Sequence, residues 1–158
     1  MSPESTRDER SQAAHDIAVK LIAEERFDIP EWQVALNPAS ERNEALVNGQ
    51  FALYPDIVAK HAEEIVAVGE IETPESVCDA EADQWRALGE SCPRMYLFVP
   101  EGMEEVAAYL IEKYGVSCAG LRKYSIGPDN DLRVESVAIS DGRVGFDNHP
   151  WWRRLGLN

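Results

Sequence analysis

Residues 65–69 form an uninterrupted apolar run, Ile-Val-Ala-Val-Gly. Side chains on a strand alternate between the two faces of a sheet, so a run without polar residues is typical of a strand buried on both faces. A second run of this kind, Met-Tyr-Leu-Phe-Val, occupies residues 95–99. A sheet with two such strands needs a covering layer on each side, which predicts an α/β fold with helices flanking a mixed central sheet.

The remaining segments provide these layers. Apolar residues recur at helical spacing in the first segment, which ends at Asp-Ile-Pro, residues 28–30. Thr73 followed by Pro74 is typical of a helix start, and Gly115 is typical of the residue after a helix end. We expect helices over residues 5–25, 73–89 and 103–114, and strands over residues 32–36, 51–58, 65–69, 94–99, 116–126 and 132–139, with residues 60–64 as a connector.

This order predicts antiparallel pairing early in the chain, where strands follow each other directly, and parallel pairing later, where helices intervene. The length of 158 residues fits a single domain over residues 1–158. We expect residues 1–4 to be frayed, residues 5–126 to form the core, and residues 127–158 to add a C-terminal strand and a Trp-rich tail.

The composition limits the partners. Asp and Glu number 29 against 15 Lys and Arg, a net charge of −14, which argues against tight non-specific binding of nucleic acid but leaves room for local contact with DNA through metal ions. The sequence shows no apolar stretch long enough for a membrane helix and no secretory signal, so we expect a cytoplasmic protein. Three scattered cysteines predict buried free thiols, and a homodimer remains open.

Acidic residues follow the first apolar run at once. Because strand side chains alternate, Glu70 and Glu72 point to the same face, where two carboxylates repel each other. A fold accepts such a pair with a raised pKa, a basic partner or a bound cation. Asp56, which follows Pro55 on the neighbouring strand, is placed to join them. Carboxylate oxygens are ligands of Mg²⁺ or Mn²⁺, so the three residues predict a divalent-metal site.

The segments Tyr-Pro-Asp-Ile-Val at 54–58 and Val-Gly-Glu-Ile-Glu-Thr at 68–73 resemble the PD-(D/E)xK nuclease superfamily. The resemblance covers residues 5–126 and implies a restriction-endonuclease-like αβββαβ core. It also implies that Asp56 and Glu70 are metal ligands, with the backbone carbonyl of Ile71 as a further ligand.

The chain departs from that pattern at one position, because Glu72 stands where the superfamily has its lysine. That lysine orients the attacking water and offsets charge in the transition state. Some restriction enzymes of similar pattern carry a glutamate there, so Glu72 is a candidate for the metal shell or for a general base. Lys123, on the last core strand, is a candidate replacement for the missing lysine.

Two helical residues are secondary candidates. Glu25 falls near the stripe formed by Ala14, Ile17, Ala18 and Leu21, so it either enters the site or lies solvated at the helix end. Gln84, on the second helix, is either close to the metal, as in the recombination nucleases that this chain resembles, or a surface amide.

His15 lies off the same stripe, and we expect it to be solvated. The tail, residues 149–154, mixes aromatic and basic residues; its tryptophans either stack on nucleic acid or dock on the domain.

The sequence thus predicts a Mg²⁺-dependent phosphodiester hydrolase, nuclease-like and acting on DNA, with Asp56, Glu70 and Glu72 at the catalytic centre. Two alternatives stay open: a catalytically inactive nuclease-fold module with a binding or regulatory role, and a protein-interaction domain whose acidic face binds a basic partner.

Overall fold

The computed structural model describes residues 8–38, 41–92 and 94–138. In this part of the chain, three α-helices enclose a six-stranded mixed sheet of strand order β1-β4-β5-β6-β7-β8. The strands are β1 (Gln33–Leu36), β4 (Ile57–His61), β5 (Glu64–Ile71), β6 (Met95–Pro100), β7 (Gly120–Gly127) and β8 (Asp131–Val137). The predicted mixed α/β architecture is confirmed, and the predicted tail and residues 1–4 lie outside the described residues.

Pairing changes from antiparallel to parallel along the sheet. β1 pairs with β4 and β4 with β5 in antiparallel register, whereas β5 pairs with β6 and β6 with β7 in parallel register. Strand β8 returns antiparallel to β7. The two parallel pairs require crossover helices, which α2 (Asp79–Ser91) and α3 (Glu104–Tyr114) provide. The predicted change in pairing along the chain is therefore confirmed.

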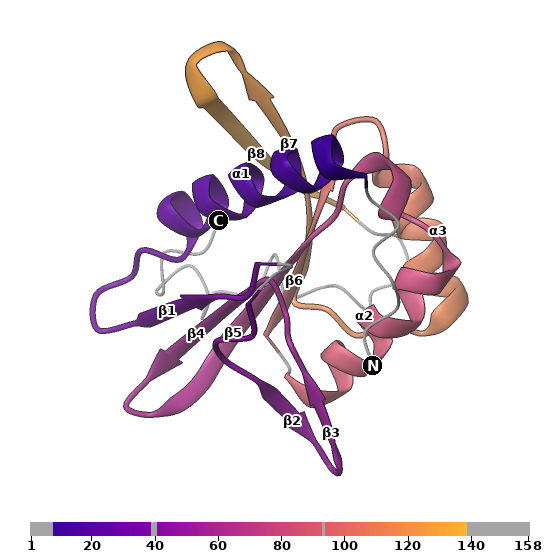
Figure 1. The fold of residues 1–158 in the computed structure, drawn as a ribbon. Helices are drawn as coiled ribbons and strands as arrows, with labels where there is room; N and C mark the ends of the chain where they lie inside the picture. Colours follow the sequence, from indigo (N-terminus) through magenta and orange to yellow (C-terminus); the bar gives the residue numbers. More distant parts are fainter. Residues whose placement is uncertain (1–7, 39–40, 93, 139–158) are drawn as a thin grey trace.

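The sheet lies between two helical layers (Figure 1). Helices α2 and α3 pack on one face, where Trp85 and Ile111 join a core with Val68 and Leu97. Helix α1 (Glu9–Arg26) covers the other face. It begins at Asp8, whose carboxylate accepts a hydrogen bond from the Ser11 amide at 2.8 Å, the usual arrangement at a helix N-cap.

The predicted strand over residues 51–58 is wrong. Its first part is β3 (Phe51–Leu53), which pairs with β2 (Leu46–Asn48) in a separate hairpin that projects from the sheet (Figure 1). Pro55 separates β3 from β4, because proline offers no amide hydrogen for pairing. Strand β4 then extends to His61, so the predicted connector over residues 60–64 is reduced to a tight turn in which Ala62 and Glu63 both have positive φ.

The predicted helix over residues 73–89 is also divided. A short 3₁₀ turn, Pro74–Ser76, precedes α2, and the extended backbone of Cys78 separates the two. The end of α3 is as predicted, with Gly115 at φ 63°. Strand β7 begins at Gly120, four residues later than predicted. The three cysteines are free, and Cys92 and Cys118 are buried. Among the described residues no helix is long and apolar enough to cross a membrane.

Candidate acidic site

Glu70 and Glu72 lie at the carboxyl end of β5, where the strand approaches α2. Their exposed fractions are 5% and 1%, so both carboxyl groups are almost completely removed from solvent. The Glu72 amide still donates to the carbonyl of Phe98 at 2.9 Å, which continues the β5–β6 pairing past Ile71. This pairing keeps the alternation of the strand, and the predicted placement of the two glutamates on one face is confirmed.

Two hydrogen bonds connect Asp56 with the Glu70–Ile71 segment at the end of β5. The Asp56 amide donates to Glu70 Oε1 at 2.9 Å, and the Ile71 amide donates to Asp56 Oδ2 at 2.8 Å. The register explains the contact, because Ile57 pairs with Gly69 and the next step of the antiparallel ladder brings Asp56 opposite Glu70. The structure therefore brings together the two acidic residues predicted as metal ligands. Asp56 is the more accessible of the two, with 15% of its side chain exposed.

Burial and mutual repulsion dominate the electrostatics. Burial raises the pKa of Glu70 well above its ordinary value of 4.5, and the charges of Asp56 and Glu72 raise this pKa further. Burial also raises the pKa of Glu72 to about 8, partly offset by its hydrogen bond with Ser76. The charge of Glu81, on α2, contributes to the raised pKa of both glutamates. Glu81 is thus a fourth acidic member that the sequence patterns did not single out.

Glu72 is held from two sides. The Trp85 indole N–H donates to Glu72 Oε1 at 3.0 Å, and the Tyr124 hydroxyl donates to the Glu72 backbone carbonyl at 2.5 Å. The side chain therefore points toward α2, while its backbone is attached to β7 on the other side of β6. We refer to Asp56, Glu70, Glu72 and Glu81 as the acidic site.

The expectation that His15 is solvated is wrong. Its exposed fraction is 3%, and its Nε2 atom lies 3.2 Å from Asp56 Oδ2. Its Nδ1 atom lies 3.1 Å from Asp16 Oδ1, so the ring lies between two carboxylates. The buried stripe of α1 consists of His15, Ala18, Val19, Ile22 and Ala23, one position away from the predicted stripe.

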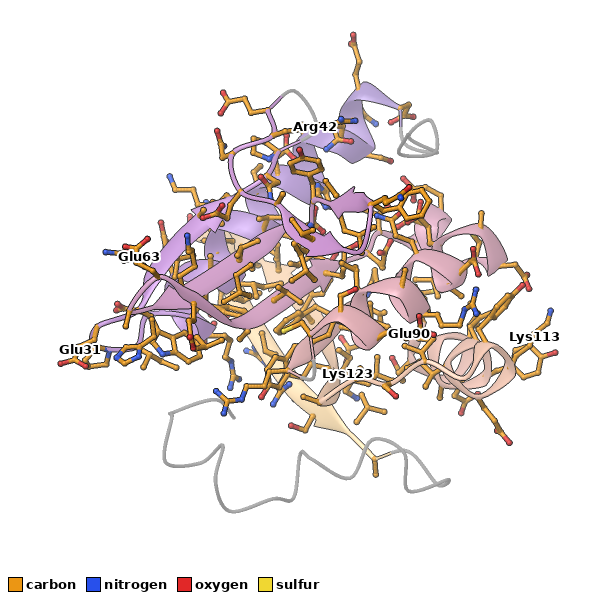
Figure 2. The ribbon with its side chains drawn as sticks, turned by 90° about the horizontal axis from the view of Figure 1, so that it is seen from below. Glu31, Arg42, Glu63, Glu90, Lys113 and Lys123 are labelled. Atoms are coloured by element: carbon orange, nitrogen blue, oxygen red, sulfur yellow. The ribbon has the colours of Figure 1, made fainter. Side chains whose placement is uncertain are left out.

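This shift also determines the placement of two other α1 residues. Glu25 is exposed at the helix end and does not enter the site, as its alternative interpretation held, and Ile17 is 48% exposed. On α2, Gln84 is half-buried, while its neighbours Trp85 and Glu81 are the residues that act on the two glutamates. Lys123 (labelled in Figure 2) lies 3.6 Å from Glu135 on β8, and this ion pair directs it toward the edge of the sheet.

The carboxylates of the acidic site fit a hard cation in their chemistry. Within the described residues, no three His, Cys, Asp or Glu side chains are arranged to hold a metal ion together. Asp56 and Glu70 do lie side by side, while Glu72 is turned toward Trp85. Mg²⁺ commonly takes one or two carboxylates and completes its shell with water and substrate oxygens, so a two-carboxylate arrangement is sufficient for it.

Two hollows open near α1. The first, of about 350 Å³, lies between α1 and the carboxyl ends of β5 and β6 and has Ala14, Thr73 and Tyr124 in its walls. The second, of about 590 Å³, lies at the other end of α1 between Phe27, Trp32 and Leu36, and its walls contain no member of the acidic site. The walls of the smaller hollow contain no member of the acidic site either.

Comparison of the chain with models of known protein families, with curated proteins and with solved structures gave no match. The function must therefore be inferred from the acidic site and its surroundings.

Proposed function

We propose that this protein is a divalent-metal-dependent phosphodiester hydrolase of nuclease type, with Asp56 and Glu70 as the protein ligands of Mg²⁺ or Mn²⁺. One observation carries the proposal: two hydrogen bonds join Asp56 to the Glu70–Ile71 segment in a buried setting, where burial and then repulsion by the Asp56 charge raise the pKa of Glu70. A cation removes this repulsion more effectively than a proton shared between the residues, because it interacts with both charges.

The element order supports the proposal. Helix α1, strands β1, β4 and β5, helix α2 and strand β6 follow one another as in the αβββαβ core, with the β2–β3 hairpin inserted before β4. Asp56 directly precedes the second core strand, β4, and Glu70 lies on the third, β5, as in the PD-(D/E)xK pattern. We infer that the fold is of the restriction-endonuclease-like kind, and this inference is tested together with the activity.

Each residue has a distinct part in this proposal. Asp56, which is more exposed than Glu70, meets the substrate side, and Glu70 lies behind it. His15 contacts Asp56 Oδ2 and orients that carboxylate. Glu72, at 1% exposure and with its pKa raised to about 8, lies in the interior and does not touch the substrate. A bound metal would polarise the scissile phosphate and lower the pKa of an attacking water.

Titration calorimetry with Mn²⁺ and Mg²⁺ tests the proposal. We expect the wild type to bind at millimolar metal and Glu70→Gln to lose this binding, since the amide keeps the shape but not the charge. Glu64→Gln is the matched control, because Glu64 is an exposed residue at the start of the same strand. Absence of binding by the wild type, or equal binding by all three proteins, would overturn the proposal.

A second candidate function is a non-catalytic module that keeps the fold and the cation. The position of Glu72 favours it, because this residue replaces the lysine of the superfamily and is held by Trp85 inside the protein. Incubation of labelled single- and double-stranded DNA with Mn²⁺ separates the two functions. Cleavage that Glu70→Gln abolishes supports the hydrolase, whereas metal binding without cleavage of either DNA supports the module.

A further inference from the structure

The larger hollow, of about 590 Å³, has mainly apolar walls. Ala23 and Phe27 of α1 line one side, and Trp32 lines the other together with Val34 and Leu36 of β1, an edge strand of the sheet. Phe27 is fully buried, whereas Val34 is 39% exposed. An apolar hollow of this size that leaves such side chains in contact with water is typical of a surface that another group covers.

The charged side chains around this hollow are mostly acidic. Glu24 and Asp28 are exposed carboxylates on its rim, and Lys20 is the cation among its lining residues. Groups that meet across a contact surface have complementary charges. A suitable occupant therefore presents apolar rings to the walls and positive charge to the rim.

The chain contains a segment of this chemistry outside the described residues. Residues 149–154, the tail segment, read His-Pro-Trp-Trp-Arg-Arg. Two arginines follow two tryptophans without an acidic residue, although Asp and Glu outnumber Lys and Arg by 29 to 15 in the whole chain. Each tryptophan buries about 150–250 Å² when it is covered, so docking of the two rings gains considerable free energy.

The last described strand lies within reach of the hollow. The Arg26 side chain donates from Nη2 to the Val134 carbonyl of β8 at 3.0 Å, and Arg26 directly precedes the wall residue Phe27. The described chain ends at residue 138, and residues 139–151 extend by at most about 45 Å. Attachment to the same chain gives an effective concentration of the order of millimolar, which favours this segment over that of a second molecule.

The β2–β3 hairpin also exposes apolar side chains, with Val47 at 68% and Phe51 at 75%. Residues 45–54 contain no acidic residue, so the hairpin itself offers no carboxylate to the two arginines. The hollow therefore fits the tail segment better than the hairpin does.

We propose that the tail segment docks in the hollow between α1 and β1, with its tryptophans on the apolar walls and its arginines at Glu24 and Asp28. This contact is independent of the proposed function, because no member of the acidic site lines the hollow. It joins the segment that follows β8 to the opposite edge of the sheet, where β1 lies.

Trypsin cleavage of the full chain tests the proposal, because trypsin cuts after arginine and docking hides both arginines of the tail segment. Mass spectrometry follows the release of peptides that begin at Arg154 or Leu155. A synthetic peptide of residues 147–158 gives the cleavage rate without docking. We expect the wild-type protein to be cut at these two bonds about tenfold more slowly than the peptide or less, since cleavage follows the undocked population.

Two matched pairs of variants locate the contact while the cleaved bonds stay the same. Val34→Gln places an amide in the apolar wall, and Val47→Gln makes the same change on the hairpin. Glu24→Gln removes a rim charge, and Glu25→Gln removes a neighbouring exposed charge outside the hollow. We expect Val34→Gln and Glu24→Gln to be cut about threefold faster than the wild type or more, and the two controls to be cut like the wild type. All four positions are exposed, and circular dichroism verifies that the variants fold.

Cleavage of the wild type at the rate of the peptide, or equal rates within either pair, would overturn the proposal. Faster cleavage of Val47→Gln alone would overturn it as well, since the tail segment would then lie on the hairpin. Protection that is lost on about tenfold dilution would indicate the hollow of a second molecule. Protection that requires added DNA would assign the tryptophans to nucleic acid, and both of these results contradict docking within one chain.

Discussion

Glu72 is the member of the acidic site that shows the cost of burying a carboxyl group most clearly. An ionised carboxylate is costly to bury unless hydrogen bonds or a cation compensate it, and at 1% exposure Glu72 has little contact with water. Its pKa of about 8 means that the side chain is mostly neutral at neutral pH. The Trp85 indole then donates to the carboxyl at 3.0 Å in either charge state, but the bond is stronger when the acceptor is ionised.

Replacing Trp85 with Phe removes this donor and also leaves a small cavity. We expect the free energy of unfolding to fall by about 2–4 kcal/mol, from lost packing and from a buried acceptor without its donor. The packing loss is independent of pH, whereas the hydrogen-bond loss grows once Glu72 ionises. Urea unfolding followed by circular dichroism, on either side of pH 8, separates the two.

A larger loss above the pKa of Glu72 is the expected result. A loss of equal size at both pH values would show that Trp85 acts only through packing. Trp32→Phe is the control, since Trp32 is half-buried in the larger hollow, away from the acidic site.

At the scale of the element, α2 is positioned by a close approach to the backbone. A Cβ atom at Gly89 would lie 2.0 Å from the Ser117 carbonyl oxygen, closer than any real contact. The absence of a side chain therefore lets the last turn of α2 pack against the segment that leads into β7. This packing also fixes Trp85, one turn earlier, against Glu72.

Gly89→Ala is expected to destabilise the protein by about 2 kcal/mol or more, although alanine favours helices intrinsically, because backbone atoms must move. Gly127→Ala is the matched control: its Cβ would be 3.7 Å from the nearest atom, an ordinary contact, and its φ of −88° suits any residue. Thermal unfolding of both variants checks the prediction, which fails if the two melt at similar temperatures.

Some of the helices and strands could be predicted from local sequence signals. Apolar runs identified β5 and β6, and the turn residues identified the end of α3, because these signals are local. The stripe of α1 was displaced by one position, since Ala18 belongs to both stripes and the alternative contains the polar His15. Hydropathy alone cannot show that a histidine is buried against a carboxylate from a distant segment of the chain, as His15 is against Asp56.

The β2–β3 hairpin and the division of the predicted helix over residues 73–89 could not be predicted, because they depend on contacts between residues distant in sequence. Residues 51–53 have strand propensity but pair with β2 instead of entering the main sheet, which only tertiary packing decides. Within the site, the alternation of β5 predicted that Glu70 and Glu72 share a face. The interaction of Glu81 with both of them required the position of α2 over that face, which no local pattern determines.

At the scale of the whole molecule, the acidic side chains form two groups, one exposed at the surface and one buried. Many charged side chains, such as Glu31, Glu63 and Lys113, lie at the outer surface (Figure 2), where water screens them. The buried glutamates are different, because folding itself removes them from water. Their titration is therefore linked to the stability of the entire domain.

The sign of this linkage follows from the direction of the shifts. The folded protein binds a proton at Glu72 with a pKa of about 8, against 4.5 as the ordinary value, and the pKa of Glu70 is raised as well. Between these values the folded state holds more protons than the unfolded state, so stability falls as the pH rises. We expect the metal-free protein to lose several kcal/mol of unfolding free energy between about pH 4.5 and 8.

Glu72→Gln measures the contribution of Glu72 to this decline. The amide oxygen still accepts from Trp85, but it carries no charge, so the variant should match the wild type near pH 4.5 and be the more stable protein above pH 8. Asp79 does not interfere, since its pKa is lowered from 3.8 and its stabilising effect is complete above that value. Urea unfolding across this range, with both proteins in EDTA, provides the curves.

Metal binding is linked to the same titration, because a cation at Asp56 and Glu70 replaces protons that the folded state otherwise holds. Added Mn²⁺ should therefore stabilise the wild type more at pH 8 than at pH 5, where protons compete for the same carboxylates. Glu70→Gln should show no such gain at either pH. A gain that is independent of pH, or that persists in this variant, would locate the cation elsewhere on the protein.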